Sequence, residues 1–257
     1  MMSYPDTYKQ IVLDYCVTHA ADHTSNSIAD YFECSVSSIY KWRKMFHTKS
    51  TKKRKKNTVI DVEGKLLERF PDYSNTKNQP KLKITTEGLY SLSHWKDANL
   101  TSKLISRHMN GRTDITITDG TANVGGNVIS FAKMFKKVNA VEIDKTNYKV
   151  LKNNIQVYEL HNVEIFNDDY TKILRRLRQD VVFLDPPWGG VGYKQHKHLD
   201  LSLGGEDISH WCRVLLENKR TKLIVLKVPK NFNKKKFSIH MKVVNLQKYD
   251  LLFLSSS

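Results

Sequence analysis

The chain has 257 residues, of which 40% are hydrophobic and 26% are charged, and this balance excludes disorder over its whole length. No apolar run approaches the roughly 20 residues that cross a bilayer, so we expect no membrane partner. Lysine and arginine total 42 against 26 acidic residues, and the formal net charge of +16 favours a nucleic-acid partner. The three cysteines are far apart in sequence, which favours a reducing compartment inside a cell, either the nucleus or the cytoplasm.

Residues 1–47 are predicted to form a small helical domain. Apolar residues recur at helical spacing over 5–19, and Ser25 or Ser27 is placed to cap a short second helix. Ser35 precedes a third segment with apolar residues at three-residue spacing, which predicts a third helix with one inward face.

The turn between the second and third helices has Glu33 or Cys34 where a glycine is usual. With that departure, the segment IADYFECSVSSIYKWRKMF resembles a helix-turn-helix of the homeodomain-like or transposase type. The resemblance implies a DNA-binding unit. Residues 1–48 carry four basic and five acidic residues, however, and this near-neutral charge also suits a helical bundle that binds protein. DNA and protein therefore remain alternative partners for residues 1–47.

Residues 48–58 are predicted to be a basic linker. Six of the eight residues at 49–56 are lysine or arginine, and none is acidic. A nuclear localisation signal, a segment that binds nucleic acid and a solvated spacer all fit this composition.

The rest of the chain divides into a predicted N-terminal extension at 59–110 and a predicted catalytic domain at 111–257. Strands and helices alternate in the catalytic part, which predicts an α/β fold with a doubly wound, Rossmann-like parallel sheet. We expect strands at 114–118, 138–142, 163–166, 181–184 and 222–228, and helices at 127–135, 146–158, 171–177 and 208–216. Segments 241–247 and 251–254 are expected to pair as a hairpin and to give the sheet an antiparallel edge.

The first of these strands ends in DGTANVGG (119–126), at the sheet edge where such folds bind ligands. The glycine spacing departs from that of dinucleotide-binding loops, and the acid at the strand tip would repel a pyrophosphate. The same acid suits the cationic amino-acid end of S-adenosylmethionine, which we therefore predict as the cofactor, with no metal required. The candidate cofactor-binding residues of this loop are Asp119, Gly120, Thr121, Asn123 and Gly125.

Acidic residues also end the next two strands. Glu142 is placed to accept hydrogen bonds from two ribose hydroxyls, and a carboxylate after the third strand, at Asp168 or Asp169, can accept one from an adenine amino group. Asn123 stands where a glycine is usual, and asparagine tolerates positive φ well.

The most specific motif is DPPWGG, which follows the apolar strand at 181–184. Its two prolines fix a rigid loop. The Asp185 side chain and the Pro186 carbonyl are two acceptors for the two hydrogens of an exocyclic aromatic amine. Trp188 offers a face on which a base can stack. These three residues are the predicted catalytic set.

These motifs resemble the trimethylguanosine synthase family of RNA cap guanine-N2 methyltransferases. The resemblance covers about residues 83–230, through TTEGLYSLSHWKDA, DGTANVGGNVISFA, AVEIDKTNYKVLKNNIQVYEL, FNDDY and VVFLDPPWGGVGY. It implies a class I methyltransferase sheet and methyl transfer from S-adenosylmethionine to the 2-amino group of a 7-methylguanosine cap, giving di- or trimethylguanosine. The implied partner is capped RNA, and the small size of the chain suits either a viral or a protist source.

The same resemblance implies roles for single residues. Asp169 would contact the adenine of the donor, and Tyr90, a further candidate cofactor-binding residue, would cover the active site from the N-terminal extension. The implied substrate-binding residues are Trp188, Tyr193, Lys230, Asn231 and Lys83.

Two alternatives remain. The family often has serine at the first position of the proline motif, whereas Asp185 is the residue of adenine-N6 methyltransferases. The first alternative is therefore a DNA or RNA adenine methyltransferase that the helix-turn-helix would target. The second is a non-catalytic nucleic-acid-binding module.

Overall fold

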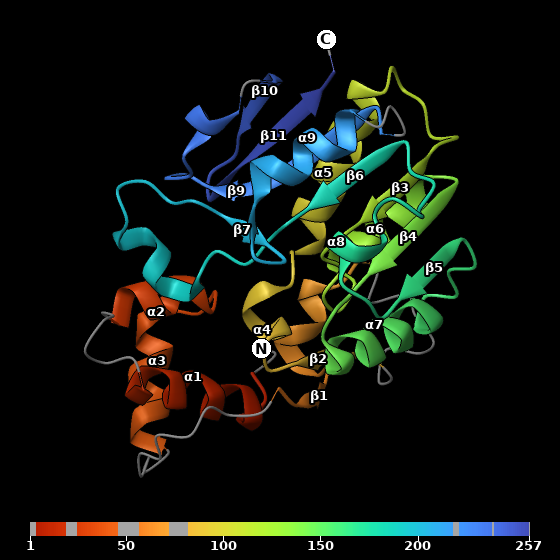
Figure 1. Cartoon of the computed structure of the whole chain (residues 1–257). Helices are drawn as coiled ribbons and strands as arrows, with labels where there is room; N and C mark the ends of the chain where they lie inside the picture. The colour runs from red at the N-terminus through yellow and green to blue at the C-terminus, as the bar shows by residue number, and fades with distance from the viewer. Residues whose placement is uncertain are drawn as a thin grey trace.

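The computed structural model describes residues 4–18, 25–45, 57–71, 82–217, 221–237 and 239–256. Most of the predicted basic linker, 48–58, lies outside these residues. A seven-stranded sheet in the order β10-β11-β9-β6-β3-β4-β5 is the centre of the fold (Figure 1). Its strands are β3 (Thr116–Asp119), β4 (Lys137–Val141), β5 (Val163–Phe166), β6 (Val181–Leu184), β9 (Leu223–Pro229), β10 (His240–Asn245) and β11 (Tyr249–Ser255).

The strands β5, β4, β3, β6 and β9 are parallel neighbours, which confirms the predicted doubly wound sheet. The predicted hairpin is also present, because β10 pairs antiparallel with β11. The prediction left open which of the two strands joins the rest of the sheet. The chain first forms the outermost strand β10, and the turn then returns β11 into the gap beside β9, to which it is antiparallel. The strand of opposite direction therefore lies one position inside the sheet edge.

Both faces of the sheet are covered, and the strand sequences are apolar for this reason. In β6, Val181 and Phe183 join one hydrophobic cluster, and Val182 and Leu184 join the other. The same alternation runs along β9 and β11. This arrangement makes β6 a rigid, fully buried support for the loop that follows it.

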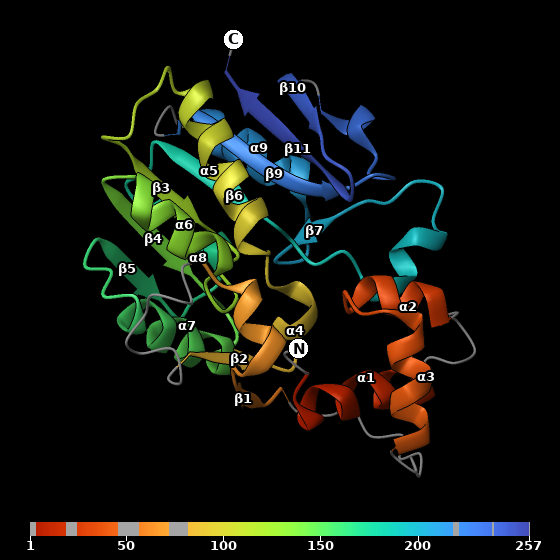
Figure 2. The same ribbon diagram turned by 180° about the vertical axis from the view of Figure 1, so that it is seen from behind.

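Three helices cover one face of the sheet and two cover the other. α5 (Trp95–His108), α6 (Gly126–Met134) and α7 (Lys145–Val157) contribute to the first cluster, and Figure 2 shows α5 and α6 in front of the sheet. α8 (Tyr170–Ile173) and α9 (Ile208–Glu217) contribute to the second. The helix predicted at 171–177 is shorter than expected. Leu174 and Leu177 are both buried, and the chain tightens into a turn between them that leads into β6.

The three helices predicted near the N-terminus are α1 (Asp6–Thr18), α2 (Ser25–Tyr31) and α3 (Val36–Met45). They pack around Tyr8, Phe32 and Trp42, which are all buried. Ser35 caps α3, because its Oγ accepts a hydrogen bond of 3.1 Å from the Ser38 amide. The boundaries and the DNA-binding character of this helical unit stay predictions.

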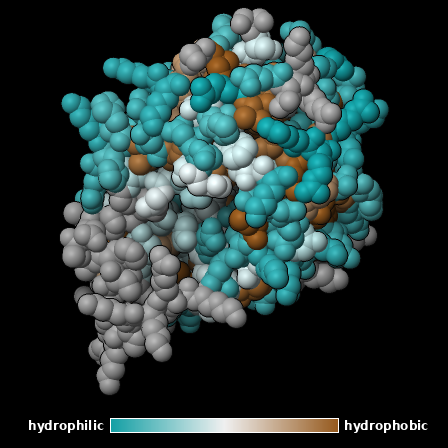
Figure 3. All heavy atoms as spheres, viewed as in Figure 1, coloured by the Kyte–Doolittle hydropathy of each residue, from teal (hydrophilic) through white to brown (hydrophobic). Residues whose placement is uncertain are grey.

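The segment before the large sheet contains β1 (Val59–Asp61), the 3₁₀ helix η1 (Gly64–Arg69), β2 (Lys83–Thr85) and α4 (Gly88–Ser91). β1 and β2 pair with each other, and Asn154 of α7 holds β2 by bonding both the amide and the carbonyl of Lys83. Shorter elements complete the chain: η4 (Gly190–Gln195), β7 (Ser202–Leu203), β8 (Glu206–Asp207) and η5 (Lys234–Lys236). In the face shown in Figure 3, hydrophobic residues appear as small areas among hydrophilic ones.

Candidate active site

The tips of β3 and β6 meet at the centre of the sheet, where the strand order reverses. Asp119 ends β3 and Asp185 follows β6. Thr121 joins the two loops, because its Oγ1 accepts a hydrogen bond of 2.8 Å from the Asp185 amide. The structure thus brings together the loop predicted to bind the cofactor and the motif predicted to bind the acceptor, at the position where ligands of doubly wound sheets bind.

The loop after β3 is shaped by two residues in left-handed conformation. Asn123 has φ of 50° and Gly125, at the start of α6, has φ of 104°. The expectation that asparagine replaces glycine at a positive φ is thus confirmed. Glu142 at the end of β4 fixes the loop, since one carboxylate oxygen accepts from the Asn123 amide at 2.7 Å and the other from the Asp144 amide at 2.8 Å.

Acidic groups are crowded in this loop region. Burial raises the pKa of Asp119 to about 8, and the nearby Asp185 and Glu142 carboxylates add to the rise. Burial likewise raises the pKa of Glu142 to about 6. An ionised carboxylate in such surroundings is stabilised by a cation, so the loop is suited to a positively charged ligand group.

Two predicted cofactor residues have structural tasks that the sequence did not indicate. A Cβ on Gly120 would lie 2.5 Å from Leu184 Cδ2 and 2.8 Å from a ring atom of Tyr170, so packing against the core requires this glycine. Its contact with a cofactor stays a prediction. Asp169 caps α8 through a hydrogen bond of 3.0 Å from the Thr171 amide to its Oδ1. Its role at an adenine stays a prediction.

The indole of Trp188 is half-buried and packs against both hydrophobic clusters. Tyr193 of η4 lies edge-on to it, with ring centroids 5.3 Å apart and an interplanar angle of 77°. The indole N–H is buried and has no hydrogen-bond acceptor of good geometry among the described residues. It nevertheless lies near enough to lower the pKa of Asp185, which burial raises.

Lys227 is a site residue that sequence reasoning missed. Its ammonium lies 2.8 Å from Asp185 Oδ2 and 2.9 Å from Ser93 Oγ, and it lies over the rings of Trp188 and Tyr249 at 5.8 and 5.0 Å. The signal was present in the sequence, because Lys227 is the one charge in the apolar run LIVLKVP. A lysine inside a strand buried on both faces requires a partner, and the acid at the tip of the neighbouring strand provides it.

Tyr90 lies on α4, where its ring stacks on Tyr31 of α2 with centroids 5.1 Å apart. The segment that carries Tyr90 is joined to the loop after β3, since Asn123 Nδ2 donates a hydrogen bond of 2.9 Å to Ser91 Oγ. Burial raises the pKa of Tyr90 to about 12. Tyr90 is thus fixed between the candidate cofactor loop and the N-terminal helices.

The remaining predicted substrate residues differ in placement. Asn231 supports the acceptor loop, because its Nδ2 donates 2.7 Å hydrogen bonds to the carbonyls of Tyr193 and His196. Lys230 is paired with the buried Asp250 at 2.6 Å. Lys83 lies in β2 against α7, and among the described residues none of its hydrogen bonds or ion pairs reaches the acceptor motif.

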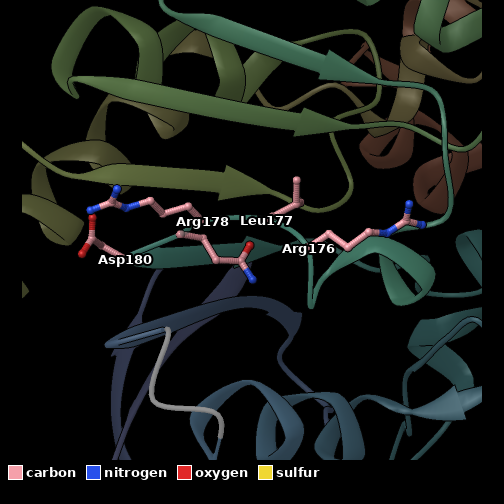
Figure 4. Close-up of a pocket in the computed structure, with 5 residues that line it drawn as sticks. Arg176, Leu177, Arg178 and Asp180 are labelled. Atoms are coloured by element: carbon pink, nitrogen blue, oxygen red, sulfur yellow. The ribbon is translucent and has the colours of Figure 1, made fainter.

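An open hollow of about 380 Å³ lies at the other end of β6, lined by residues 176–180. Figure 4 shows Arg176 and Arg178 extending in opposite directions from this loop. Asp180 there is already paired with Lys222 at 3.0 Å. The hollow precedes β6, whereas Asp185 and Trp188 follow it, so it is separate from the site described above.

The family model for RNA cap guanine-N2 methyltransferases matches residues 115–254, which is more than half of the chain. The chain belongs to this family. The matched residues contain both loops of the candidate site, from the tip of β3 to the hairpin that ends in β11.

Three curated proteins are similar to this family member. An uncharacterized protein, L320, of Acanthamoeba polyphaga mimivirus is 43% identical over 140 residues, 53% of this chain and 55% of the relative. The trimethylguanosine synthase of Schizosaccharomyces pombe is 32% identical over 84 residues, 30% of this chain and 35% of that enzyme. The ribosomal RNA small subunit methyltransferase D of Buchnera aphidicola is 26% identical over 183 residues, 70% of this chain and 86% of that enzyme. The chain thus spans about half of the first relative and about a third of the second.

Among solved structures, the Thermus thermophilus 16S rRNA N2 G1207 methyltransferase, determined with AdoMet and guanosine, aligns with a TM-score of 0.48 and 17% identity. The alignment covers 62% of this chain and 43% of that one. Among the described residues, no helix has both the length and the apolar character needed to cross a membrane.

Proposed function

We propose that this chain is an S-adenosylmethionine-dependent methyltransferase that acts on the exocyclic 2-amino group of guanine in a 7-methylguanosine RNA cap. The observation that carries the proposal is the meeting of the acidic loop after β3 with the Asp185–Trp188 motif after β6, joined at Thr121. Family membership and the similarity to a trimethylguanosine synthase support guanine as the base. The similarity to a mimivirus protein supports a virus-encoded chain that acts in the nucleus or cytoplasm of its host.

The residues of the β3 loop fit the proposed donor. Asp119 is buried with a raised pKa, so a cationic amino-acid group beside it would stabilise the ionised carboxylate. The oxygens of Glu142 each accept one amide hydrogen bond and keep a second lone pair for a ribose hydroxyl. Asp169 would accept from the adenine amine with the oxygen that does not cap α8. When bound, S-adenosylmethionine supplies a methyl group on a positively charged sulfur.

The motif after β6 fits the proposed acceptor. Trp188 would stack on the 7-methylguanine, whose positive ring gains from an aromatic face. Asp185 and the Pro186 carbonyl would accept the two amine hydrogens and so aim the nitrogen lone pair toward the donor. Lys227 holds the Asp185 carboxylate in place through their 2.8 Å ion pair. The rate would come from this positioning, and no general base is required, because the methylated amine readily loses its extra proton to water.

A methyl-transfer assay with radiolabelled S-adenosylmethionine tests the proposal. A 7-methylguanosine cap analogue, an unmethylated cap analogue and a DNA duplex serve as acceptors in parallel. We expect label only in the 7-methylguanosine analogue, on the 2-amino group after digestion to nucleosides. Label in the duplex as N6-methyladenine, with none in the cap analogue, would contradict the proposal.

One observation favours that second outcome. Asp185 stands at the first position of the proline motif, as in adenine-N6 methyltransferases, and the structure shows it buried beside Lys227. We therefore keep adenine as the second candidate base. In that case the N-terminal helices would bring the enzyme to DNA or RNA through α3 and the basic linker. The similarity to a ribosomal RNA methyltransferase supports RNA rather than DNA as the polymer.

A further inference from the structure

The N-terminal helical unit contacts the candidate active site through α2 and the turn that follows it. Tyr31 stacks on Tyr90 with an interplanar angle of 22°, and Phe32 lies edge-on to the same ring at 6.2 Å. Asp30 lies 3.9 Å from Lys194 of η4, the 3₁₀ helix that also carries Tyr193. α2 therefore touches η4, which follows the acceptor motif, and α4, which is joined to the loop after β3. Figure 1 shows α2 beside the η4 segment and α3 farther from the sheet.

The turn after α2 has an unusual residue at its centre. Glu33 has φ of 52°, a conformation in which helix ends normally place glycine. Two backbone hydrogen bonds define this helix end. The Cys34 amide donates to the Ala29 carbonyl at 2.9 Å, and the Glu33 amide donates to the Asp30 carbonyl at 3.3 Å. Glycine would fit this position without strain, so the contacts of the Glu33 side chain are what glutamate adds here.

The Glu33 carboxylate joins the helical unit to two distant parts of the chain. One oxygen lies 3.6 Å from Arg69 Nη2, and the other lies 3.2 Å from Lys248 Nζ. Arg69 is buried, and its guanidinium also donates to the carbonyls of Leu89 and Leu92, on either side of Tyr90. Lys248 lies in the turn between β10 and β11. The carboxylate thus ties the turn after α2 to the segment that carries Tyr90 and to the large sheet.

We propose that α2 and its turn form one wall of the acceptor site, that Glu33 latches this wall to the catalytic sheet, and that Tyr31 positions Tyr90 for acceptor binding. The inference rests on the proposed function, since it assigns the helices a part in binding the acceptor of that reaction.

The chain offers a matched control for the latch. Glu159 follows α7 and has φ of 53°. The same two backbone hydrogen bonds are present there, because the Leu160 amide donates to the Ile155 carbonyl and the Glu159 amide donates to the Gln156 carbonyl. Glu159 is exposed, and no ion pair of it is found in the part of the chain that the structure describes. Substitution by glycine relieves the backbone strain of a positive φ at both positions. Only at position 33 does it also remove ion pairs, those with Arg69 and Lys248.

The first test compares Glu33→Gly with Glu159→Gly in the full chain. We expect Glu33→Gly to raise the acceptor KM by roughly twofold to fivefold, as loss of a partly exposed ion pair predicts, while calorimetry shows the donor Kd unchanged. Glu159→Gly keeps the wild-type acceptor KM and the same or a higher Tm. An unchanged acceptor KM in Glu33→Gly would overturn the latch.

The second test concerns Tyr31. Tyr31→Ala is expected to raise the acceptor KM by roughly threefold to tenfold, as loss of an aromatic pair predicts. Tyr31→Phe keeps the stack and restores most of the acceptor affinity. Tyr40→Ala, on the exposed part of α3, is the control for a tyrosine lost from the same helical unit. Equal KM values in Tyr31→Ala and Tyr40→Ala would overturn the positioning role.

Hydrogen exchange separates failure of this inference from failure of the proposed function. Glu33→Gly is expected to speed amide exchange in both α2 and α4, whereas Glu159→Gly leaves both unchanged. If the wild-type chain methylates no guanine acceptor but Glu33→Gly still loosens α4, the proposed function fails and the latch stands. If exchange in α4 is unchanged, the latch fails whatever the activity.

Discussion

The ammonium of Lys227 lies 2.8 Å from the carboxylate of Asp185, on a neighbouring strand and at the centre of the candidate acceptor site. Both side chains are largely withdrawn from water, with exposed fractions of 12% and 17%. The pair opposes the effect of burial, since Lys227 lowers the carboxyl pKa that burial raises above its ordinary value. The Lys227 ammonium also lies over the Trp188 ring, so the ion pair and the indole face are next to each other in the acceptor site.

Lys227→Met tests whether this pair serves the reaction or only the fold. Removing the cation leaves a buried carboxylate without its partner, so we expect a loss of about 1–3 kcal/mol in the free energy of unfolding, measured in urea. Adding Asp185→Asn to Lys227→Met should recover most of that stability, because no unpaired charge remains. We expect kcat/KM to stay at least roughly 100-fold below wild type in the double variant. Recovery of activity together with stability would show that the pair is only structural.

Trp188→Ala tests the stacking face. Loss of base stacking is worth about 1–3 kcal/mol, so the acceptor KM should rise by roughly fivefold to more than 100-fold. The acceptor KM of Trp188→Phe, which keeps an aromatic face, should lie between that of Trp188→Ala and that of the wild type. The donor Kd from calorimetry should be the same in all three proteins, because the donor loop is formed by β3 and β4. Parallel loss of donor and acceptor affinity would argue against a stacking role.

The catalytic sheet was predictable because its strands are locally determined. The alternation of apolar runs such as VVFL with helical segments indicated a parallel sheet, and the acids at the strand tips indicated the edge where a ligand binds. The position of β11 was not predictable in the same way. A hairpin sequence fixes the pairing of its two strands but does not decide which of them enters the sheet.

The residues of the candidate site were predictable where they stand together in one motif. They were less predictable where a residue depends on a contact with another that is distant in sequence. Asp185 and Trp188 stand in one motif, whereas the contacts of Glu33 with Arg69 and Lys248 join residues that are 36 and 215 positions apart. No local pattern reveals such a pairing. Gly120 illustrates a third case, because the sequence indicated a ligand contact there but gave no sign that packing against Leu184 and Tyr170 also requires a glycine.

Gly120→Ala follows from that packing. The added methyl group would lie 2.5 Å from Leu184 and 2.8 Å from Tyr170, both buried, so the core must shift. We expect a loss of about 1–3 kcal/mol in the free energy of unfolding. Gly111→Ala is the control, since its added Cβ meets no atom within 4 Å. Its only cost is the backbone strain of an alanine at φ of 79°. If Gly120→Ala is no more destabilising than Gly111→Ala in urea, the close packing at Gly120 is not rigid.

The raised pKa of Asp119 predicts a pH dependence of donor binding. With a pKa near 8, against an ordinary value of 3.8, the carboxyl of the folded, unliganded protein holds a proton between about pH 4 and pH 8. The unfolded chain has lost that proton, so this group makes the folded state less stable as the pH rises through the window. A cationic donor favours the ionised form, and its affinity should therefore increase from pH 6 to pH 8 and level off above pH 8.

Calorimetry in two buffers of different ionisation enthalpy measures this coupling, because donor binding near pH 7 should release a proton to the buffer. Asp119→Asn cannot ionise, so it should bind the donor more weakly and lose the part of the pH dependence that Asp119 causes. The rise of the Glu142 pKa to about 6 should persist in that variant and leave a smaller dependence at lower pH. Donor affinity that is flat between pH 6 and pH 8 in the wild-type protein would contradict a cation beside Asp119.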